Sequence, residues 1–250
     1  MKRYFVKLSY KGTHFHGWQI QPNAISVQEV LQKAFSLLLR EDIAVVGAGR
    51  TDTGVHAINY IAHFETVKRI ENLNQLIYKL NSFLTDDIVV HDIFPVSEEM
   101  HARFSAISRT YEYRIHQNKD PFLTETSLYL YEKLDFELMN SAAEILFEYK
   151  DFTSFSKLHT DTKTNFCKIL RAEWIKRENQ NIFIISADRF LRNMVRAVTG
   201  TLLDIGRGKN SKDDLRKIIE SKDRSSAGVS VPAHGLFLTE IKYPEILNYS

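Results

Sequence analysis

The sequence predicts an α+β fold made of two ferredoxin-like (RRM-like) halves that join into one wide, mainly antiparallel sheet. Segments with the two-residue alternation of strands are interspersed with segments of helical periodicity. In the first half they follow the order strand-helix-strand-strand-helix-strand. We expect helices on one face of the sheet and a central active-site cleft that suits an elongated ligand. The two halves are expected at residues 1–104 and 105–250.

The first half combines alternating strands with helices that have recognisable starts. Tyr4, Val6 and Leu8 alternate with polar residues in the first strand. Ser26 and Glu29 have capping-box spacing, and apolar residues recur at helical intervals after them. The six elements are expected, in order, at about 2–10, 27–40, 42–48, 55–65, 71–83 and 87–94.

The second half shows the same kinds of pattern. Residues 109–117 alternate as a strand that places Tyr111 and Tyr113 on one face, so we expect at least one of the two rings in the core. A helix is expected from about Phe190 to Leu203. The remaining elements are a helix at about 135–148 and strands near 165–177, 181–187 and 235–242.

Composition excludes several classes of protein. At 250 residues with 44% hydrophobic content, the chain is long enough to bury a sizeable core. Its one cysteine, Cys167, rules out an internal disulfide framework, and without a His-Glu-x-x-His motif we expect no metal site. No apolar run approaches membrane-span length, so we expect a cytoplasmic protein with no membrane contact. A net charge of +2 neither requires nor excludes a nucleic-acid partner.

The run from Gly47 to Ala57 is the most informative part of the chain, because it places Arg50 and Asp52 among three glycines. Its spacing fits neither the dinucleotide fingerprint nor the phosphate-binding P-loop. We expect Gly47, Gly49 and Gly54 to bend a short loop around Asp52. Spacing alone leaves two interpretations open: a functional carboxylate, or a solvated ion pair contributing about 0–1 kcal/mol.

Basic and aromatic residues give weaker signals. Helical spacing would align Arg189, Arg192 and Arg196 in one stripe, which is either a solvated face or a site where one arginine pairs with a carboxylate and the others meet phosphates. A tyrosine of the 109–117 strand that faces a cleft could stack on a nucleobase. The run from His101 to Phe104 interleaves basic and aromatic side chains, which favours a nucleic-acid contact at Arg103.

These motifs together resemble the tRNA pseudouridine synthases of the TruA type, nearly from end to end. The runs that carry the resemblance are Tyr10-Lys11-Gly12-Thr13, Gly17-Trp18-Gln19, Ser26-Val27-Gln28, Gly47 to Ala57, Arg109-Thr110-Tyr111-Glu112-Tyr113, Asp151-Phe152-Thr153-Ser154-Phe155, Phe190-Leu191-Arg192-Asn193-Met194-Val195-Arg196 and Ala233-His234-Gly235-Leu236. Coincidence is remote because the runs are separate and stand in the family's order.

The resemblance implies an isomerase that converts uridine to pseudouridine at positions 38, 39 and 40 of the tRNA anticodon stem-loop, by base flipping and without a cofactor. Asp52 in the N-terminal half would be the catalytic aspartate, and Arg196 in the C-terminal half its ion-pair partner. Tyr111 would stack on the target base, Arg50 would help to extrude it, and Arg192 would contact the RNA. The resemblance also implies a homodimer that binds tRNA across both subunits.

Two other functions share some of these features. A non-catalytic RNA-binding protein could have the ferredoxin-like order, but the aromatic run of RNA-recognition modules is absent from the sequence. An aspartate-dependent nucleoside hydrolase would share the nucleophile and release free base. Product analysis separates the hydrolase from the isomerase.

Overall fold

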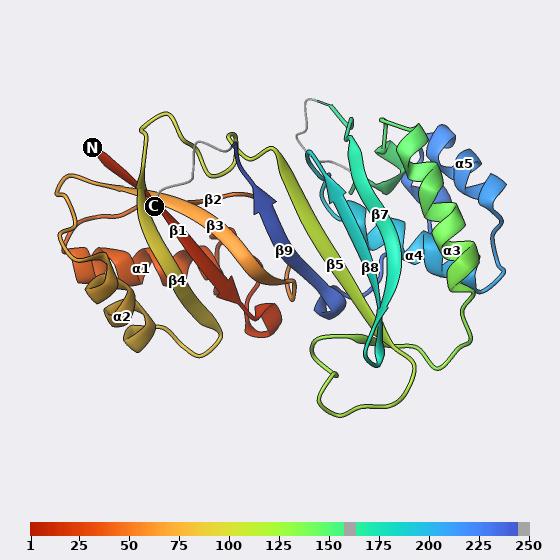
Figure 1. Cartoon of the computed structure of the whole chain (residues 1–250), viewed down its shortest axis with the longest axis horizontal. Helices are drawn as coiled ribbons and strands as arrows, with labels where there is room; N and C mark the ends of the chain where they lie inside the picture. Colours follow the sequence, from red (N-terminus) through yellow and green to blue (C-terminus); the bar gives the residue numbers. More distant parts are fainter. Residues whose placement is uncertain (158–163, 245–250) are drawn as a thin grey trace. The chain divides into compact units, whose positions relative to one another are not determined.

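The computed structural model describes residues 1–157 and 164–244 (Figure 1). These residues contain nine strands and five α-helices, which confirms the α+β class. The chain divides into two units, and each is described by itself below. The described part of the first unit is residues 1–107 and 237–244, and that of the second is 108–157 and 164–236.

The first unit follows the predicted order of elements. These are β1 (Lys2–Tyr10), α1 (Val27–Leu39), β2 (Val45–Gly47), β3 (His56–Thr66), α2 (Leu73–Phe83) and β4 (Ile88–Val96), and the unit also includes β9 (Leu236–Lys242) from Phe237 onward. Its strands lie in the order β4-β1-β3-β9, and β2 pairs with β3 as well. All of these pairs are antiparallel except the parallel pair of β3 and β9, so the pairing is mixed.

Alternation along β1 divides the core of the first unit between the two faces of its sheet. Tyr4 stacks on Phe64, which also packs against Phe35 of α1 at 4.4 Å between ring centroids. Phe5, the residue after Tyr4 in β1, belongs to a separate cluster with Ala48, Ile61 and Ala102. The helix α1 begins as predicted, because the Ser26 hydroxyl accepts a hydrogen bond from the Glu29 backbone N–H.

The second unit contains a three-stranded antiparallel arrangement, β5-β8-β7, with the short β6 paired in parallel to the end of β5. Trp174 of β7 stacks on Phe183 of β8, and α4 passes behind these strands in Figure 1. The Asn140 side chain of α3 bonds both backbone groups of Trp174 and ties that helix to the strand. The elements are β5 (Ser108–His116), β6 (Leu128–Tyr129), α3 (Phe136–Ala143), β7 (Ile169–Arg177), β8 (Gln180–Ala187), α4 (Met194–Gly206) and α5 (Lys212–Ser221).

The helix expected from Phe190 begins four residues later, so the predicted arginine stripe is wrong. Asn193 precedes the first helical residue with a left-handed φ of 67°, and the Met194 N–H bonds the Leu191 carbonyl in a turn. Of Arg189, Arg192 and Arg196, only the last is on the helix.

Two elements had no counterpart in the sequence prediction, β6 and α5. The start of α5 is a full capping box between Ser211 and Asp214, a signal that was available in the sequence. Among residues 1–157 and 164–244, no helix is long and apolar enough to cross a membrane. The same residues hold no cluster of three or more His, Cys, Asp or Glu side chains that could bind a metal.

Candidate active site

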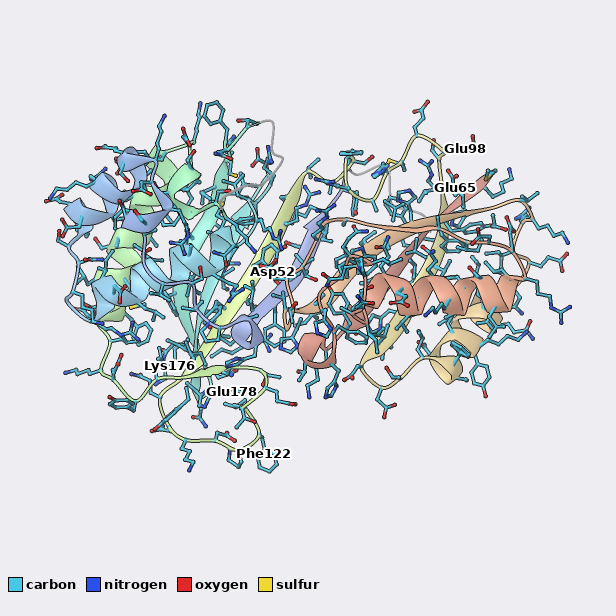
Figure 2. All side chains as sticks on the ribbon, turned by 180° about the vertical axis from the view of Figure 1, so that it is seen from behind. Asp52, Glu65, Glu98, Phe122, Lys176 and Glu178 are labelled. Atoms are coloured by element: carbon cyan, nitrogen blue, oxygen red, sulfur yellow. The ribbon has the colours of Figure 1, made fainter. Side chains whose placement is uncertain are left out.

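Asp52 lies on the connection between β2 and β3, and Figure 2 labels it there. Its carbonyl accepts a hydrogen bond from the Val55 N–H at 3.1 Å, so residues 52–55 form a tight turn. Gly54, third in this turn, has a φ of 80°, the left-handed value that a type II turn requires at that position. The Asp52 residue is half-buried. The turn therefore fixes the backbone that carries the carboxylate.

Residues 10–18 form hydrogen bonds with the residues before and after Asp52. The Trp18 N–H donates to the Thr51 carbonyl at 3.2 Å, and the Gly54 N–H donates to the Phe15 carbonyl at 3.3 Å. The Tyr10 hydroxyl lies 2.9 Å from the Thr51 hydroxyl, and both residues are buried. Backbone and side-chain bonds thus fix the residues on both sides of Asp52.

Two of the three predicted glycines, Gly47 and Gly54, shape the loop, and so does Gly17, which was not predicted to. Gly54 alone of the three predicted glycines has a positive φ. A Cβ on Gly47 would lie 2.2 Å from the Tyr60 hydroxyl, so glycine is needed there for close packing, whereas a Cβ on Gly49 would meet nothing within 4 Å. Gly17 has a φ of 87°, and a Cβ there would lie 2.3 Å from the Thr51 carbonyl oxygen. Sequence reasoning gave Gly17 no structural role, because its partner is 34 positions away.

Arg50 precedes the turn and is exposed. The residue before it, Gly49, is held by the Tyr60 hydroxyl, which donates to the Gly49 carbonyl. Tyr60 is fully buried and stacks on Trp18 at 4.2 Å between ring centroids. The exposed guanidinium therefore extends from a backbone that is fixed by the core.

Arg103 is the other site residue predicted in the first unit. It is exposed, and its guanidinium carbon lies 5.5 Å from the centroid of the Phe104 ring. The preceding residue, Ala102, is buried in the same cluster as Ala48. The base of the Arg103 turn and the residue that follows β2 therefore belong to one core cluster.

The two tyrosines of β5 differ in burial and in their contacts within the second unit. Tyr113 is buried, and its hydroxyl donates to the Pro232 carbonyl at 2.8 Å. Burial raises the pKa of Tyr113, whereas the positive charge of Arg196 acts to lower it. Tyr111 is half-buried and meets the Phe190 ring edge-on at 5.2 Å. The prediction that at least one of these rings belongs to the core is confirmed, and Tyr111 is the accessible one.

Arg196 is held in the first turn of α4 by the segment that precedes β9. Its Nε donates to the Val231 carbonyl at 2.7 Å, and the Val231 N–H donates to the Arg196 carbonyl at 3.2 Å. The residue is half-buried, and its charge acts on Tyr113. Arg192 is exposed and lies in the turn before the helix, where its carbonyl accepts from the Lys157 N–H. The structure thus associates Arg196 with Tyr113 and leaves Arg192 outside the helix.

His63 of β3 connects the sheet to the Arg103 turn. Its Nδ1 accepts a hydrogen bond from the Ala102 N–H at 3.1 Å, which requires an unprotonated nitrogen. Burial, helped by the positive charges of His101 and Arg3, lowers the pKa of His63 to about 4, while Glu65 opposes this shift. A neutral His63 is therefore part of the native structure of the first unit.

We expect acidification to destabilise the protein through His63. The unfolded side chain has a pKa of about 6.5, so as pH falls from there to about 4 the unfolded state takes up a proton that the folded state excludes. The resulting loss in free energy of unfolding is on the order of 2 kcal/mol and levels off below that window. Urea denaturation of the wild type and of His63→Asn, in which the amide oxygen replaces Nδ1 as acceptor, measures the difference. Equal pH profiles for the two proteins would contradict the assignment.

Comparison with known proteins identifies the family of this chain. A family profile described as tRNA pseudouridine synthase matches residues 8–105 and 142–244. Proteins named tRNA pseudouridine synthase A are similar over nearly the whole chain. The one from Parabacteroides distasonis is 54% identical over 99% of this chain and 98% of its own. The one from Bacteroides fragilis is 53% identical over 98% of both, and the one from Thermoanaerobacter sp. is 40% identical over 97% of this chain and 100% of its own. The chain therefore belongs to the tRNA pseudouridine synthase family and is an isomerase of tRNA uridine.

Proposed function

We propose that this enzyme forms pseudouridine at positions 38, 39 and 40 of the tRNA anticodon stem-loop, with Asp52 as its catalytic carboxylate. The observation that carries the proposal is the Asp52 turn: its backbone is fixed by the Val55 bond and its neighbours are clamped, while the aspartate itself is only half-buried. A preorganised carboxylate of this kind loses little entropy when it meets a reacting atom.

The reaction requires a nucleophile or base and no redox partner. The bond from ribose C1′ to base N1 breaks, the base turns, and a bond from C1′ to C5 forms, while C5 loses a proton and N1 gains one. Three routes satisfy this balance: Asp52 attacks C1′, it attacks base C6, or it removes a ribose proton to give a glycal. In each route the carboxylate is ionised and close to the ribose or the base.

Other predicted site residues have complementary roles in this proposal. Flipping the target base out of the stem costs a few kcal/mol, and a base–aromatic stack with Tyr111 returns about 1–3 kcal/mol. The exposed Arg50 would help to extrude the base, and Arg196 would pair with the Asp52 carboxylate. The exposed positions of Arg192 and Arg103 suit phosphate contacts.

The finer description of the fold and assembly belongs to the same proposal. In the first unit, the element order and the strand order β4-β1-β3-β2 support a ferredoxin-like half. We propose a corresponding half in the second unit, a central active-site cleft, and a homodimer that binds the anticodon arm. Sedimentation equilibrium measures the mass of the assembly with and without tRNA.

The direct test is incubation of the enzyme with an unmodified tRNA transcript, followed by mapping of pseudouridine to single nucleotides. We expect pseudouridine at positions 38, 39 or 40, wherever the transcript has uridine there. Pseudouridine elsewhere would overturn the assignment of position. Free uracil with an abasic site would indicate a nucleoside hydrolase, and binding without any product would indicate a non-catalytic RNA-binding protein.

We expect Arg196→Ala to lose activity and some stability. The substitution removes the guanidinium proposed to pair with Asp52, which should lower kcat at least about 100-fold because a partly buried carboxylate then lacks its partner. It also leaves the Val231 carbonyl without its Nε donor, at a cost of about 1 kcal/mol. Kinetics with tRNA and urea denaturation measure the two effects. Arg171→Ala is the control, since its pair with Glu173 is exposed on β7. Full activity of Arg196→Ala would remove this residue from the site.

A further inference from the structure

Phe104 is a largely exposed aromatic side chain on a hydrogen-bonded turn of the first unit. Its exposed fraction is 75%, while Ala102, two residues earlier, is fully buried. Single exposed apolar side chains are common on protein surfaces, so any role of Phe104 depends on how the ring is held and on what surrounds it.

Hydrogen bonds from His101 fix the turn that carries Phe104. The His101 Nδ1 accepts from the backbone N–H groups of Arg103 and Phe104 at 3.1 and 3.3 Å. The Ser105 N–H donates to the His101 carbonyl, and the Ser105 hydroxyl accepts from the His101 N–H, both at 2.9 Å. Below the turn, the Ala102 carbonyl accepts from the Tyr243 hydroxyl at 2.6 Å. The backbone of the turn that carries Phe104 is therefore fixed before any ligand binds.

A row of rings supports Phe104 from the core outward. The buried His63 ring meets His101 edge-on at 4.6 Å, and His101 packs against Phe104 at 4.4 Å between centroids. The Arg103 guanidinium carbon lies 5.5 Å from the same Phe104 ring. The turn thus combines a supported, largely exposed aromatic ring with an adjacent cation. Base stacking together with phosphate pairing is how proteins bind unstacked nucleotides.

The position of the turn relates it to the proposed site. Ala102 packs in one cluster with Ala48, and Ala48 stands two residues before Arg50 and four before Asp52. The aromatic platform and the Asp52 loop are therefore anchored to the same part of the first-unit core.

We propose that Phe104 is a positioning residue for tRNA: its ring stacks on an unpaired base of the bound tRNA, and Arg103 pairs with a phosphate of the same strand. This inference rests on the proposed function, and it adds a contact that holds the strand while the target base leaves the stack. The ring acts on the position of the RNA and takes no part in bond making.

The test compares Phe104→Ala with Phe104→Tyr and with Phe83→Ala. Phe83 is the control because it is also an exposed phenylalanine of the first unit, 51% exposed at the end of α2. Loss of one base stack should raise KM and the Kd for tRNA about 5- to 150-fold in Phe104→Ala, with kcat at saturating tRNA within about 3-fold of wild type. Phe104→Tyr keeps a ring and should restore both constants, and Phe83→Ala should leave them unchanged. Arg103→Ala should reduce the slope of log Kd against log salt by about 1.

Three results would overturn the inference. These are an unchanged KM and Kd in Phe104→Ala, failure of tyrosine to restore them, or a fall in assembly mass that accounts for the weaker binding. The Kd is also measured without chemistry, by fluorescence anisotropy in an Asp52→Asn background. If the wild type forms no pseudouridine at positions 38 to 40 but Kd still depends on the Phe104 ring, the proposed function fails and the stacking contact stands. If pseudouridine forms at those positions but Kd does not depend on the Phe104 ring, the stacking contact fails and the proposed function stands.

Discussion

The Asp52→Asn variant is expected to lose at least about 1000-fold in kcat while it folds and binds tRNA like the wild type. Asparagine has the size of aspartate, and the turn depends on the backbone carbonyl of residue 52, which accepts from the Val55 N–H in either protein. An amide is neither a useful nucleophile nor a base, so only the chemical step is lost. Multiple-turnover formation of pseudouridine with saturating tRNA measures kcat, and anisotropy measures Kd.

The matched control for this substitution is Asp42→Asn, an exposed aspartate ahead of β2. It changes the protein's charge by the same amount without touching the loop, and it should leave kcat and Kd within about 2-fold of wild type because isolated surface charges contribute little. Substantial turnover by Asp52→Asn would exclude Asp52 as the catalytic carboxylate. Loss of folding together with activity would make its role structural.

Gly17→Ala is expected to lose both stability and activity although it adds only one carbon. Alanine at a φ of 87° is strained, and its Cβ would lie 2.3 Å from the Thr51 carbonyl oxygen, a backbone atom. Strain and overpacking each cost about 1–3 kcal/mol. Relief of the clash must displace Thr51 and with it the adjacent Asp52. A shift of about 1 Å in a catalytic group can cost roughly 100-fold in rate.

Gly49→Ala provides the contrast, because it makes the same chemical change within the Asp52 loop. A Cβ on Gly49 would meet nothing within 4 Å, and Gly49 is not among the glycines with a positive φ. We expect its free energy of unfolding to stay within about 1 kcal/mol of wild type or to rise slightly, since alanine restricts the unfolded chain. Urea denaturation and kcat are measured on both variants. Equal effects of the two would show that the close contact of Gly17 with Thr51 does not control the loop.

Local patterns were sufficient to locate most helices and strands. Ser26 marked the start of α1 because capping is a contact between residues three apart. The start of α4 was placed wrongly because Leu191 fits the helical spacing, yet Asn193 takes a left-handed conformation that ends the periodicity. Periodicity reports which positions are apolar and does not report backbone conformation at a single residue.

In the site, too, the features set by neighbouring residues were predictable from the sequence, and those set by contacts between distant residues were not. The sequence drew attention to the Asp52 loop through its own glycines, but the glycine that packs against Thr51 comes from position 17, where only the folded backbone brings the two together. Alternation placed Tyr111 and Tyr113 on one face and could not separate them. The difference arises because the Tyr113 hydroxyl meets the carbonyl of Pro232, 119 residues later in the chain.

The first unit cannot complete its sheet until strand β9 has been synthesised. The β3 strand that follows the Asp52 loop pairs with β9 at His56 and Phe237, whose rings also stack at 4.6 Å. The whole second unit, residues 108–236, is translated between them. At about 5–20 residues per second, the ribosome takes roughly 6–26 s to synthesise that interval. During this time residues 1–107 have been made but lack β9, so the sheet of the first unit can be completed only after the second unit has been synthesised.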